Sequence, residues 1–510
     1  MKRVKPWVKI ALIAIVVIGI GFGLKFLAGN EEVSSSTAKT SGGLSGLLSS
    51  TPTYVIGVNT YGGFTPIVWL NGGLEPNSES IITKEYGVKL KIVIQDDFAA
   101  GRSAFKKGDI DMIYCTADAL PIEMGEAADM TDARHFMMLN WSRGADAIVV
   151  SKHVQTVADL KGKRVAVAEG TAAHTLLINT LETNGVKPNE ITLVKVSNGG
   201  EAAQYFKAKQ VDACVTWSPD DMDCVAAVPG SKVLVSTKQA SNIICDGLIA
   251  KASFLEKNKK DVAKIVSAIL YANSVMNSDP AKVREAAQVF AKSFGTDAQF
   301  CIDGCANIRF ATLGDEANFY GLNSTYTGVK GDELYSKMSR IYEGLNLTKK
   351  PLAWRRVSDP SIIEMLMTAN DVRGDQSAEH VRTFTAPTQE LAKKEAISNK
   401  KVTINFPVNG YVLDGDARML IDREFVSIAK QFSGARIRVE GNTDNTGNYN
   451  SNVELSRKRA QAVVDYLVNE YGFDANRFIS IGNGPKHAIK DNVVGSNQNY
   501  RTTDFQLISE

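Results

Sequence analysis

Residues 439–467 read VEGNTDNTGNYNSNVELSRKRAQAVVDYL and carry the most specific signal in the chain. The pattern predicts a strand that ends at Gly441, a polar loop with Asp444 at its tip, and a helix that begins near Asn452, a residue type suited to capping. A loop followed by a helix can bring Asp444 and Arg459 together, and a carboxylate beside a guanidinium can hold both the ammonium and the carboxylate of one ligand. The alternative is an internal surface ion pair, which contributes little.

This segment resembles the OmpA-like peptidoglycan-binding domain, and the resemblance covers about residues 400–508. The motif that carries it is TD-x-x-G followed by N-x-x-LS-x-x-RA. The resemblance implies that Asp444 receives the ammonium of diaminopimelate in the peptidoglycan stem peptide and that Arg459 receives a carboxylate. The residues that it places in the same pocket are Thr443, Asn452 and Leu455.

The sequence departs from that family at two places. Asn442 stands where the family often has histidine, and the usual Asn-Arg-Arg appears as Asn499-Tyr500-Arg501, which puts the ligand contacts of the last strand in question. Around the motif the pattern predicts an α+β domain over residues 401–510. The expected strands are 402–406, 435–441, 477–484 and 502–509, and the expected helix before the motif is 416–432.

Upstream, residues 53–371 alternate strand-like and helix-like stretches, which predicts an α/β fold. The expected strands are TYVIGV (53–58), LKIVIQ (90–95), IDMIYC (110–115), KRVAVAEG (163–170), ITLVKV (191–196) and VDACVTW (211–217). An internal echo relates residues 104–115 to residues 205–214, because Phe105 and Phe206 each precede an aspartate by six positions. We interpret it as two similar lobes, each with an open sheet; the alternative is a chance likeness of two helix–strand units.

The same region resembles periplasmic solute-binding proteins of the nitrate/sulfonate/taurine receptor type. The resemblance is carried by DLKGKRVAVAEGTAAHTLL (159–177), by the helix–GDIDMIYC unit, and by VDACVTWSPD (211–220). It implies a two-lobed, type II-like binding-protein fold that closes around a small solute and serves an ABC-type permease or another envelope protein. Enzymes use this fold too, so the fold alone does not give the activity.

Ligands of open α/β sheets bind beyond the carboxyl ends of the strands, which points to particular loops. The candidate solute-binding residues are Thr60, Tyr61, Gly62, Gly63, Thr65, Cys115, Thr116, Gly170, Thr171, Ala172, Ala173, Trp217, Asp220 and Asp246. The helix start after Gly170 favours a negative group, whereas Asp220 or Asp246 can take an amine. The solute is left as an anion or a zwitterion, with a cation also compatible with the acidic residues. We expect the lobes to cross over near residues 146–151 and 243–248.

Each of these residues also has a structural interpretation. Gly62-Gly63 can form a simple turn, Trp217 can belong to the core, and Asp246 can cap a turn.

The N-terminal residues predict a membrane anchor. Lys2, Arg3 and Lys5 precede an uninterrupted apolar run over residues 10–24, and lysines that snorkel at its ends extend it to the ~20 residues that a spanning helix needs. We expect residues 1–30 to stay in the inner membrane with the N-terminus in the cytoplasm and the bulk of the chain in the periplasm. The alternative is a cleaved signal peptide.

Two linkers separate the predicted parts. Residues 31–52 are rich in Ser, Thr and Gly, which is typical of a flexible linker, and residues 372–400 form a second linker with a short exposed helix. The cysteines permit up to three disulfides in an oxidising compartment, with Cys301 and Cys305 close enough to pair locally. Buried thiols are the alternative for Cys115 and Cys214.

Composition limits the function classes. A net charge of +2 indicates no nucleic acid partner. The sequence has no HExxH pair, no Cys/His cluster at zinc spacing and no Ser/His/Asp arrangement, so we expect no metal, no cofactor and no enzyme. The leading hypothesis is a membrane-anchored binding protein that grips peptidoglycan. The second hypothesis is a structural or sensory envelope scaffold whose receptor-like domain docks a protein partner.

Overall fold

The computed structural model describes residues 51–125, 130–380, 382–404, 406 and 409–508. The predicted anchor (1–30) lies outside the described residues, and so does the predicted first linker (31–52) apart from its last two residues. Across the described part of the chain, no helix is both long and apolar enough to cross a membrane.

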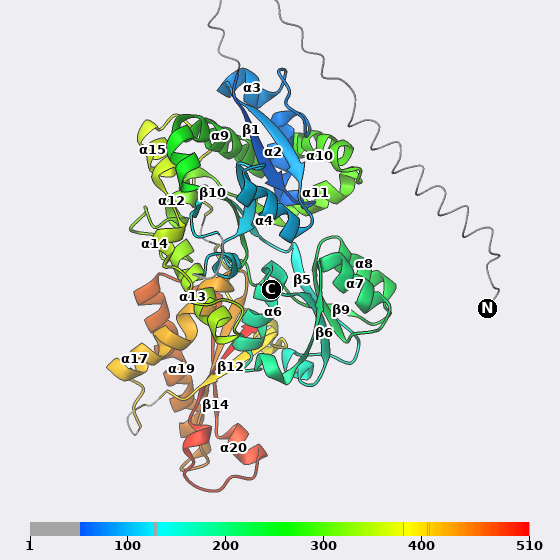
Figure 1. The fold of residues 1–510 in the computed structure, drawn as a ribbon. Helices are drawn as coiled ribbons and strands as arrows, with labels where there is room; N and C mark the ends of the chain where they lie inside the picture. Colours follow the sequence, from blue (N-terminus) through cyan, green and yellow to red (C-terminus); the bar gives the residue numbers. More distant parts are fainter. Residues whose placement is uncertain (1–50, 126–129, 381, 405, 407–408, 509–510) are drawn as a thin grey trace, which may run out of the picture. The chain divides into compact units, whose positions relative to one another are not determined.

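Lobe one is built on a six-stranded sheet in the order β11-β4-β10-β3-β1-β2. Figure 1 labels β1 and β10 of this sheet. Its strands are β1 (Thr53–Val58), β2 (Lys89–Ile94), β3 (Met112–Thr116), β4 (Ala133–Ser142), β10 (Cys245–Lys251) and β11 (Ile308–Phe310). β1 pairs in parallel with β2 and β3, whereas β10 runs antiparallel to β3 and β4. The helices α2 (Thr65–Asn71), α9 (Ala252–Ser278) and α10 (Pro280–Phe294) share one apolar core with this sheet.

Lobe two is built on a five-stranded sheet in the order β7-β6-β8-β5-β9. Its strands are β5 (Asp146–Val150), β6 (Arg164–Ala168), β7 (Thr192–Val196), β8 (Ala213–Trp217) and β9 (Lys232–Ser236). Successive side chains of β5 join two different cores: Ile148 packs with the helix α6 (Ala172–Thr183), and Val149 packs with the helix α7 (Gly199–Lys207). Since neighbouring side chains of a strand point to opposite faces, α6 and α7 cover opposite faces of the sheet.

The internal similarity between residues 104–115 and 205–214 corresponds to one helix–strand unit in each lobe. The unit of lobe one is α4 (Phe98–Lys107) followed by β3, and that of lobe two is α7 followed by β8. In both units the strand is central and pairs in parallel with the first parallel strand of its lobe, β1 or β6. The two-lobed α/β interpretation is therefore confirmed.

The chain crosses between the lobes twice. The first crossing joins β4 to β5 through residues 143–145, and the second joins β9 to β10 through residues 237–244. The prediction of a crossing at 146–151 is wrong, because these residues form β5 and pair within lobe two. The second prediction, 243–248, overlaps the junction and extends into β10. Asp146 and Asp246 consequently lie at the starts of the strands that follow the two crossings.

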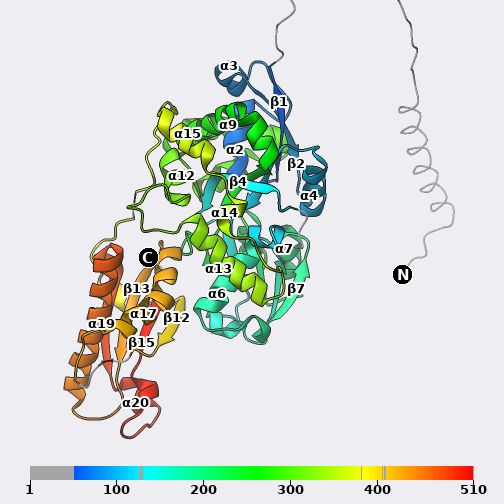
Figure 2. The ribbon, with the colours of Figure 1, turned by 60° about the vertical axis from the view of Figure 1, so that its left-hand side comes forward.

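The C-terminal domain has a four-stranded sheet in the order β12-β15-β13-β14. Its strands are β12 (Ser398–Val402), β13 (Arg436–Asn442), β14 (Phe478–Gly484) and β15 (Thr503–Ile508). The long helix α19 (Tyr449–Tyr471) packs along β13 and β14 (Figure 2). Before them, α17 (Gly415–Ile421), the π-helical turn η4 (Asp422–Val426) and α18 (Ser427–Gln431) form the helix predicted over 416–432. The short helix predicted in the second linker is α16 (Gln389–Lys393).

Two local predictions for this domain are wrong. The strand predicted over 402–406 ends at Val402, because Val402 pairs with Thr503 at the first residue of β15 and the ladder stops there. The helix predicted to begin near Asn452 begins at Tyr449, since Asn448 caps it by accepting a hydrogen bond from the Ser451 N–H at 3.1 Å. Asn452 instead lies in the first turn, where its Nδ2 donates to the Thr446 carbonyl oxygen at 2.6 Å.

The six cysteines all lie within the described residues, and no disulfide joins any of them. Each is buried as a free thiol, which agrees with the alternative stated for Cys115 and Cys214. The sulfur atoms of Cys214 and Cys224 are 3.9 Å apart, well beyond the bond length of about 2.05 Å of a disulfide.

Candidate functional site

A cavity of about 70 Å³ lies where the two lobes face each other. Its volume gives room for about five water molecules, or for one small organic group of similar size. The predicted residues that line the cavity are Tyr61, Thr116, Gly170, Thr171, Ala172, Trp217 and Asp246. The lining residues that the sequence did not single out are Asn59, Phe98, Arg102, Tyr114, Ala119, Glu123, Asp146 and Ile244.

The register of the hinge strands brings the central residues together. Asp246 lies opposite Thr116 at the end of β3, and Asp146 lies opposite Trp217 at the end of β8. In lobe one the carboxyl end of β3 therefore lies beside Asp246 of β10. In lobe two the carboxyl end of β8 lies beside Asp146 of β5. The arrangement places the cavity beyond the carboxyl ends of β3 and β8, where ligands of open sheets bind.

The other predicted solute-site residues do not line the cavity. Thr60 is held in the turn after β1, where its N–H and its hydroxyl donate to Asp96 at 2.7 and 2.8 Å. Gly62 packs on the backbone of Gly304, and Gly63 packs under the Tyr61 ring. Thr65, Cys115 and Ala173 are buried in the lobes, and Asp220 begins the helix α8 (Asp220–Ala227) beside the cavity rather than in it.

The cavity is acidic. The carboxylate of Asp246 is 93% buried, as its relative exposure is 7%, and no hydrogen bond to it is found among the described residues. Burial, with the nearby charges of Asp146 and Asp118, holds the pKa of Asp246 well above its ordinary value. Burial also raises the pKa of Asp146 to about 6, although the Ser142 hydroxyl donates to Asp146 Oδ2 at 2.7 Å.

The guanidinium in the lining is already neutralised. Arg102 of α4 makes a two-pronged ion pair with Glu123, in which Nη2 lies 2.9 Å from Oε1, and Nη1 donates to the Tyr114 carbonyl oxygen at 2.8 Å. Burial opposes its charge, but Glu123 outweighs that effect and raises the pKa of Arg102. Arg102 therefore brings no net positive charge to the cavity.

The C-terminal site is centred on Asp444, which lies in the loop between β13 and α19 and is buried. The sequence paired it with Arg459, but its ion pair is with Arg501, whose Nη2 lies 2.7 Å from Oδ2. The loop and the start of β15 meet here, and the Asn497 N–H and the Thr446 hydroxyl also donate to the Asp444 carboxylate. Burial alone would raise the pKa of Asp444, but these donors hold it below the ordinary value.

Arg459 lies close enough to this pair to feel both charges. Burial and the positive charge of Arg501 lower the pKa of Arg459, and Asp444 opposes them. Its Nε donates to the Gly410 carbonyl oxygen at 3.0 Å, and its guanidinium lies 4.9 Å from the centre of the Phe406 ring. Arg501 is thus the ion-pair partner of the buried carboxylate, and the Arg459 guanidinium lies close enough to feel the charges of both.

The remaining predicted wall-site residues surround the same loop. Thr443 is buried beside Asp444 and donates to its carbonyl oxygen at 3.0 Å. Asn452 and Leu455 lie on the first turns of α19 and are partly exposed. In the sequence, Arg501 stands out only as part of the departure Asn499-Tyr500-Arg501 from the family pattern. Its 57-residue separation from Asp444 gives no local signal of the ion pair.

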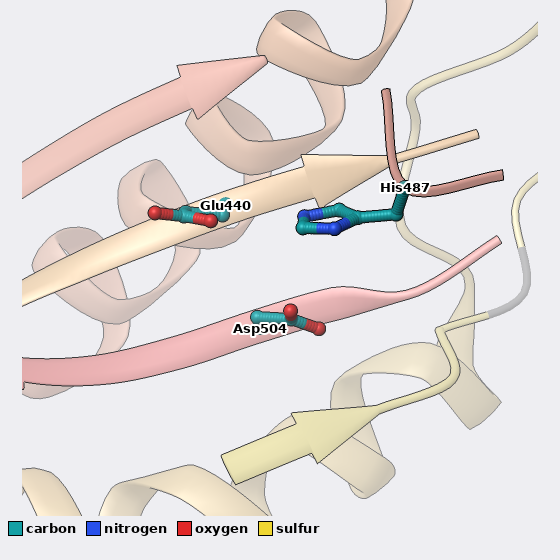
Figure 3. A group of neighbouring side chains, drawn as sticks. All are labelled: Glu440, His487 and Asp504. Carbon is teal, nitrogen blue, oxygen red and sulfur yellow. The ribbon is translucent and has the colours of Figure 1, made fainter. Parts of the chain in front are cut away.

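One group in the described part of the chain has side chains that could hold a metal ion: Glu440, His487 and Asp504, whose ligand atoms lie within 4.8 Å of one another (Figure 3). Glu440 and Asp504 face each other across β13 and β15. Both Glu440 oxygens are already engaged, Oε1 by Arg438 at 2.8 Å and Oε2 by Asn483 at 2.8 Å. We therefore treat the group as a hydrogen-bonded polar cluster.

Comparison with known proteins matches two separate segments. Residues 84–283 match the family model described as NMT1/THI5 like, and residues 405–502 match that of the OmpA family. A protein of Escherichia coli named as an aliphatic sulfonates-binding protein is 26% identical over 156 residues, which are 30% of this chain and 47% of that protein. Outer membrane porin F of Pseudomonas aeruginosa is 38% identical over 72 residues, which are 14% of this chain and 21% of that protein.

Among solved structures, the periplasmic aliphatic sulphonate binding protein of Escherichia coli aligns at 20% identity with a TM-score of 0.48, covering 60% of this chain and 97% of that one. The chain spans less than half the length of the curated relatives that it matches. Both resemblances drawn from the sequence are confirmed at the level of these segments: residues 84–283 match the NMT1/THI5 like model and residues 405–502 match the OmpA family model.

Proposed function

We propose that this chain is a cell-envelope protein that binds peptidoglycan through its OmpA family domain and a small solute in the cavity between its two lobes. It acts by binding and carries out no reaction. The peptidoglycan part rests on the family match and on the buried Asp444 with two nearby guanidinium groups. The solute part rests on the NMT1/THI5-like match and on a cavity lined from both lobes.

The observation that carries wall binding is the charge arrangement around Asp444. Its carboxylate is held ionised by Arg501, the Thr446 hydroxyl and the Asn497 N–H, so it can receive the ammonium of a diaminopimelate side chain. Arg459 lies beside it and can receive the carboxylate of the same side chain. A zwitterionic ligand would then satisfy both groups at once.

A sedimentation assay with purified peptidoglycan tests this. The full chain should sediment with peptidoglycan that contains diaminopimelate, and an Asp444→Ala, Arg459→Ala double variant should stay in the supernatant. Arg457→Ala is the matched control, because Arg457 is exposed on the same helix and pairs only with Glu454 among the described residues. Equal sedimentation of the double variant and the control would reject the proposed site.

The solute is proposed to bind as in other two-lobed receptors, by closure of the lobes about the crossing segments. Native mass spectrometry of the detergent-solubilised full chain, purified gently, would detect a solute that copurifies. A bound small molecule would support the receptor function. A cavity that stays empty after a solute screen would favour the scaffold hypothesis and leave wall binding as the remaining activity.

For location, we propose that residues 1–30 anchor the chain in the inner membrane, with residues 53–510 in the periplasm; this rests on the sequence pattern. An ABC-type permease is the partner that a solute-binding domain of this kind would serve. A reporter that is active only in the periplasm, fused after residue 510, should be active. Loss of the chain from the membrane fraction after deletion of residues 1–30 tests the anchor.

A further inference from the structure

The cavity gathers buried carboxyl groups that no cation of the described residues neutralises. Asp146 and Asp246 both line it and are 5% and 7% exposed. Asp118 lies behind them, fully buried, with one carboxylate oxygen that has no hydrogen-bond partner among the described residues. The charges that act on Asp246 are those of Asp146 and Asp118, both negative. Clustered buried carboxylates without a cation raise the free energy of the folded state, so a cationic occupant would lower it.

The one guanidinium of the lining does not supply that cation. Arg102 forms its two-pronged pair with Glu123, on the side of the cavity formed by α4 and the short helix α5 (Leu120–Glu123). A receptor for a bare anion needs free positive charge or several unpaired donors in the cavity. Within the described residues this cavity has instead an unpaired carboxylate at Asp246, an amide oxygen without a partner at Asn59, and one unpartnered hydroxyl, at Tyr61, which can donate or accept. Asp246 and Asn59 both line the cavity, and their unpaired oxygens are acceptors, so among these unpaired groups a single hydroxyl is the donor offered to a bare anion.

The rest of the lining suits an organic cation. The aromatic side chains that line the cavity are Tyr61, Phe98, Tyr114 and Trp217. The faces of aromatic rings attract ammonium groups, and the attraction grows when water is excluded. The cavity of about 70 Å³ has room for a small charged group between these rings.

A metal ion fits this cavity less well. In the described part of the chain, three or more His, Cys, Asp or Glu side chains converge closely enough to hold a metal only at Glu440, His487 and Asp504, in the C-terminal domain. The aspartates of the cavity are therefore too far apart to form such a ligand set. Hard metal ions also prefer oxygen ligands on several sides, not aromatic walls.

We propose that the solute of the two-lobed domain carries an ammonium group, which Asp146 and Asp246 bind from the two sides of the hinge while the aromatic residues enclose it. This proposal rests on the proposed solute-binding function and names the chemical class of its ligand. An ammonium solute that also bears a carboxylate would direct that group to the start of α6, where Gly170, Thr171 and Ala172 line the cavity.

Isothermal titration of the full chain with four probes tests the proposal: choline, glycine betaine, methanesulfonate and acetate. We expect one of the two ammonium probes to bind and the two plain anions to give no heat of binding. Tight binding of choline would indicate a pure cation site, and preference for glycine betaine would indicate a zwitterion. Asp246→Asn should weaken the ammonium probe at least tenfold, and Asp146→Asn should weaken it similarly. Asp223→Asn removes one exposed charge from α8 and should leave the affinity unchanged.

Binding of methanesulfonate or acetate without either ammonium probe would overturn the ammonium assignment and leave the proposed solute binding intact. Equal ammonium affinity in Asp246→Asn and in Asp223→Asn would overturn the assigned site. If none of the four probes binds and a broad solute screen finds no ligand, both the assignment and the receptor function fail. Because each aspartate-to-asparagine change keeps shape and removes a buried charge, misfolding is not expected; circular dichroism of each variant checks this.

Discussion

Asp111 and Asp212 occupy the same structural position in the two lobes. Each lies just before the central strand of its lobe and accepts a backbone hydrogen bond through Oδ2, Asp111 from the Val55 N–H at 2.8 Å and Asp212 from the Arg164 N–H at 2.9 Å. Each also donates its own N–H to the carbonyl oxygen of that same residue. The carboxylate thus joins the starts of two parallel strands, β1 with β3 and β6 with β8.

This equivalence predicts equal and separate energetic roles. Asp111→Ala and Asp212→Ala should each lower the free energy of unfolding by about 1–2 kcal/mol, because each leaves a backbone N–H without its acceptor. The double variant should lose the sum to within about 0.5 kcal/mol, since the two sites share no partner. Urea denaturation measures all three, with the exposed Asp109→Ala as control. A double variant no less stable than either single one would contradict separate roles.

Much of the strand arrangement of the two lobes could be predicted from the periodicity of the sequence. The strands predicted at 53–58, 90–95, 110–115, 163–170, 191–196 and 211–217 agree with β1, β2, β3, β6, β7 and β8 to within two residues at each end. The strands of the two lobes that were not predicted are β4, β5, β9, β10 and the short β11. The stretches of β4, β5 and β10 are buried almost throughout and gain their partners from distant segments, so a local alternating pattern does not reveal them.

Gly63 should control the position of the Tyr61 ring. A Cβ atom at Gly63 would lie 2.5 Å from Tyr61 Cε1 and 2.7 Å from Asn140 Nδ2. We therefore expect Gly63→Ala to displace the ring, to cost about 1–3 kcal/mol of stability, and to weaken the ammonium probe severalfold. Titration and urea denaturation measure the two effects. Gly344→Ala is the control, because a Cβ there meets nothing within 4 Å. Unchanged probe affinity in Gly63→Ala would mean that Tyr61 does not position the solute.

The cavity acids predict an unusual pH dependence. Burial raises the pKa of Asp146 to about 6 and that of Asp118 to about 7, while both lie near 4 in an unfolded chain. Their contribution to stability is present in full below pH 4 and is lost as the pH rises through 6 to 7. Asp146→Asn should therefore raise the free energy of unfolding at pH 7.5 by on the order of 2 kcal/mol, and with it the melting temperature. At pH 4 the substitution should have little effect.

Thermal melts of the wild type and Asp146→Asn at these two pH values make the measurement. The charged neighbours are Asp221, which acts on Asp146, and Asp118, which acts with Asp146 on Asp246; all are acidic, so they strengthen the same trend. Asp223→Asn, which removes an exposed charge, should show no difference between the two conditions. A shift of equal size at both pH values in Asp146→Asn would show that repacking, not titration, is responsible.

Arg501→Gln should act on Asp444 in the opposite sense. Asp444 has a lowered pKa in the folded chain, so it stabilises the fold above its unfolded pKa and loses that contribution as the pH falls. Without Arg501 we expect a loss of about 1–2 kcal/mol at pH 7, a smaller loss on acidification, and weaker sedimentation with peptidoglycan. Lys490→Gln, exposed on α20 (Lys486–Lys490), is the control. Normal stability and sedimentation in Arg501→Gln would remove Arg501 from the site.

Cys214 and Cys224 should be the pair most open to oxidation. Their sulfur atoms are 3.9 Å apart, and the hydrogen bond from Cys214 lowers the pKa of Cys224, which favours its thiolate. Diamide, a thiol oxidant, should link them with loss of two hydrogen atoms, and peptide mapping should recover the crosslink. Cys115, whose pKa burial raises, should stay reduced. A crosslink absent in wild type after oxidation would contradict the pairing.

The solute site was less accessible from sequence than the wall site. The motif of the proposed wall site occupies one continuous segment, so Asp444, Thr443, Asn452 and Leu455 could be proposed from the family resemblance. The cavity instead draws Arg102 and Glu123 from two helices and Asp146 from a crossing strand, and their pairing depends on how the strands are ordered. The prediction that residues at strand ends line the cavity is correct for Thr116 and Trp217. It is wrong for Thr60 and Cys115, which do not line it.

The two crossings give the hinge a chemical property of its own. Each delivers one acidic residue to the cavity, Asp146 at the start of β5 and Asp246 at the start of β10. The two segments about which the lobes would turn therefore also carry the groups proposed to bind the solute. A change at either aspartate should for that reason be tested for its effect on lobe movement as well as on affinity.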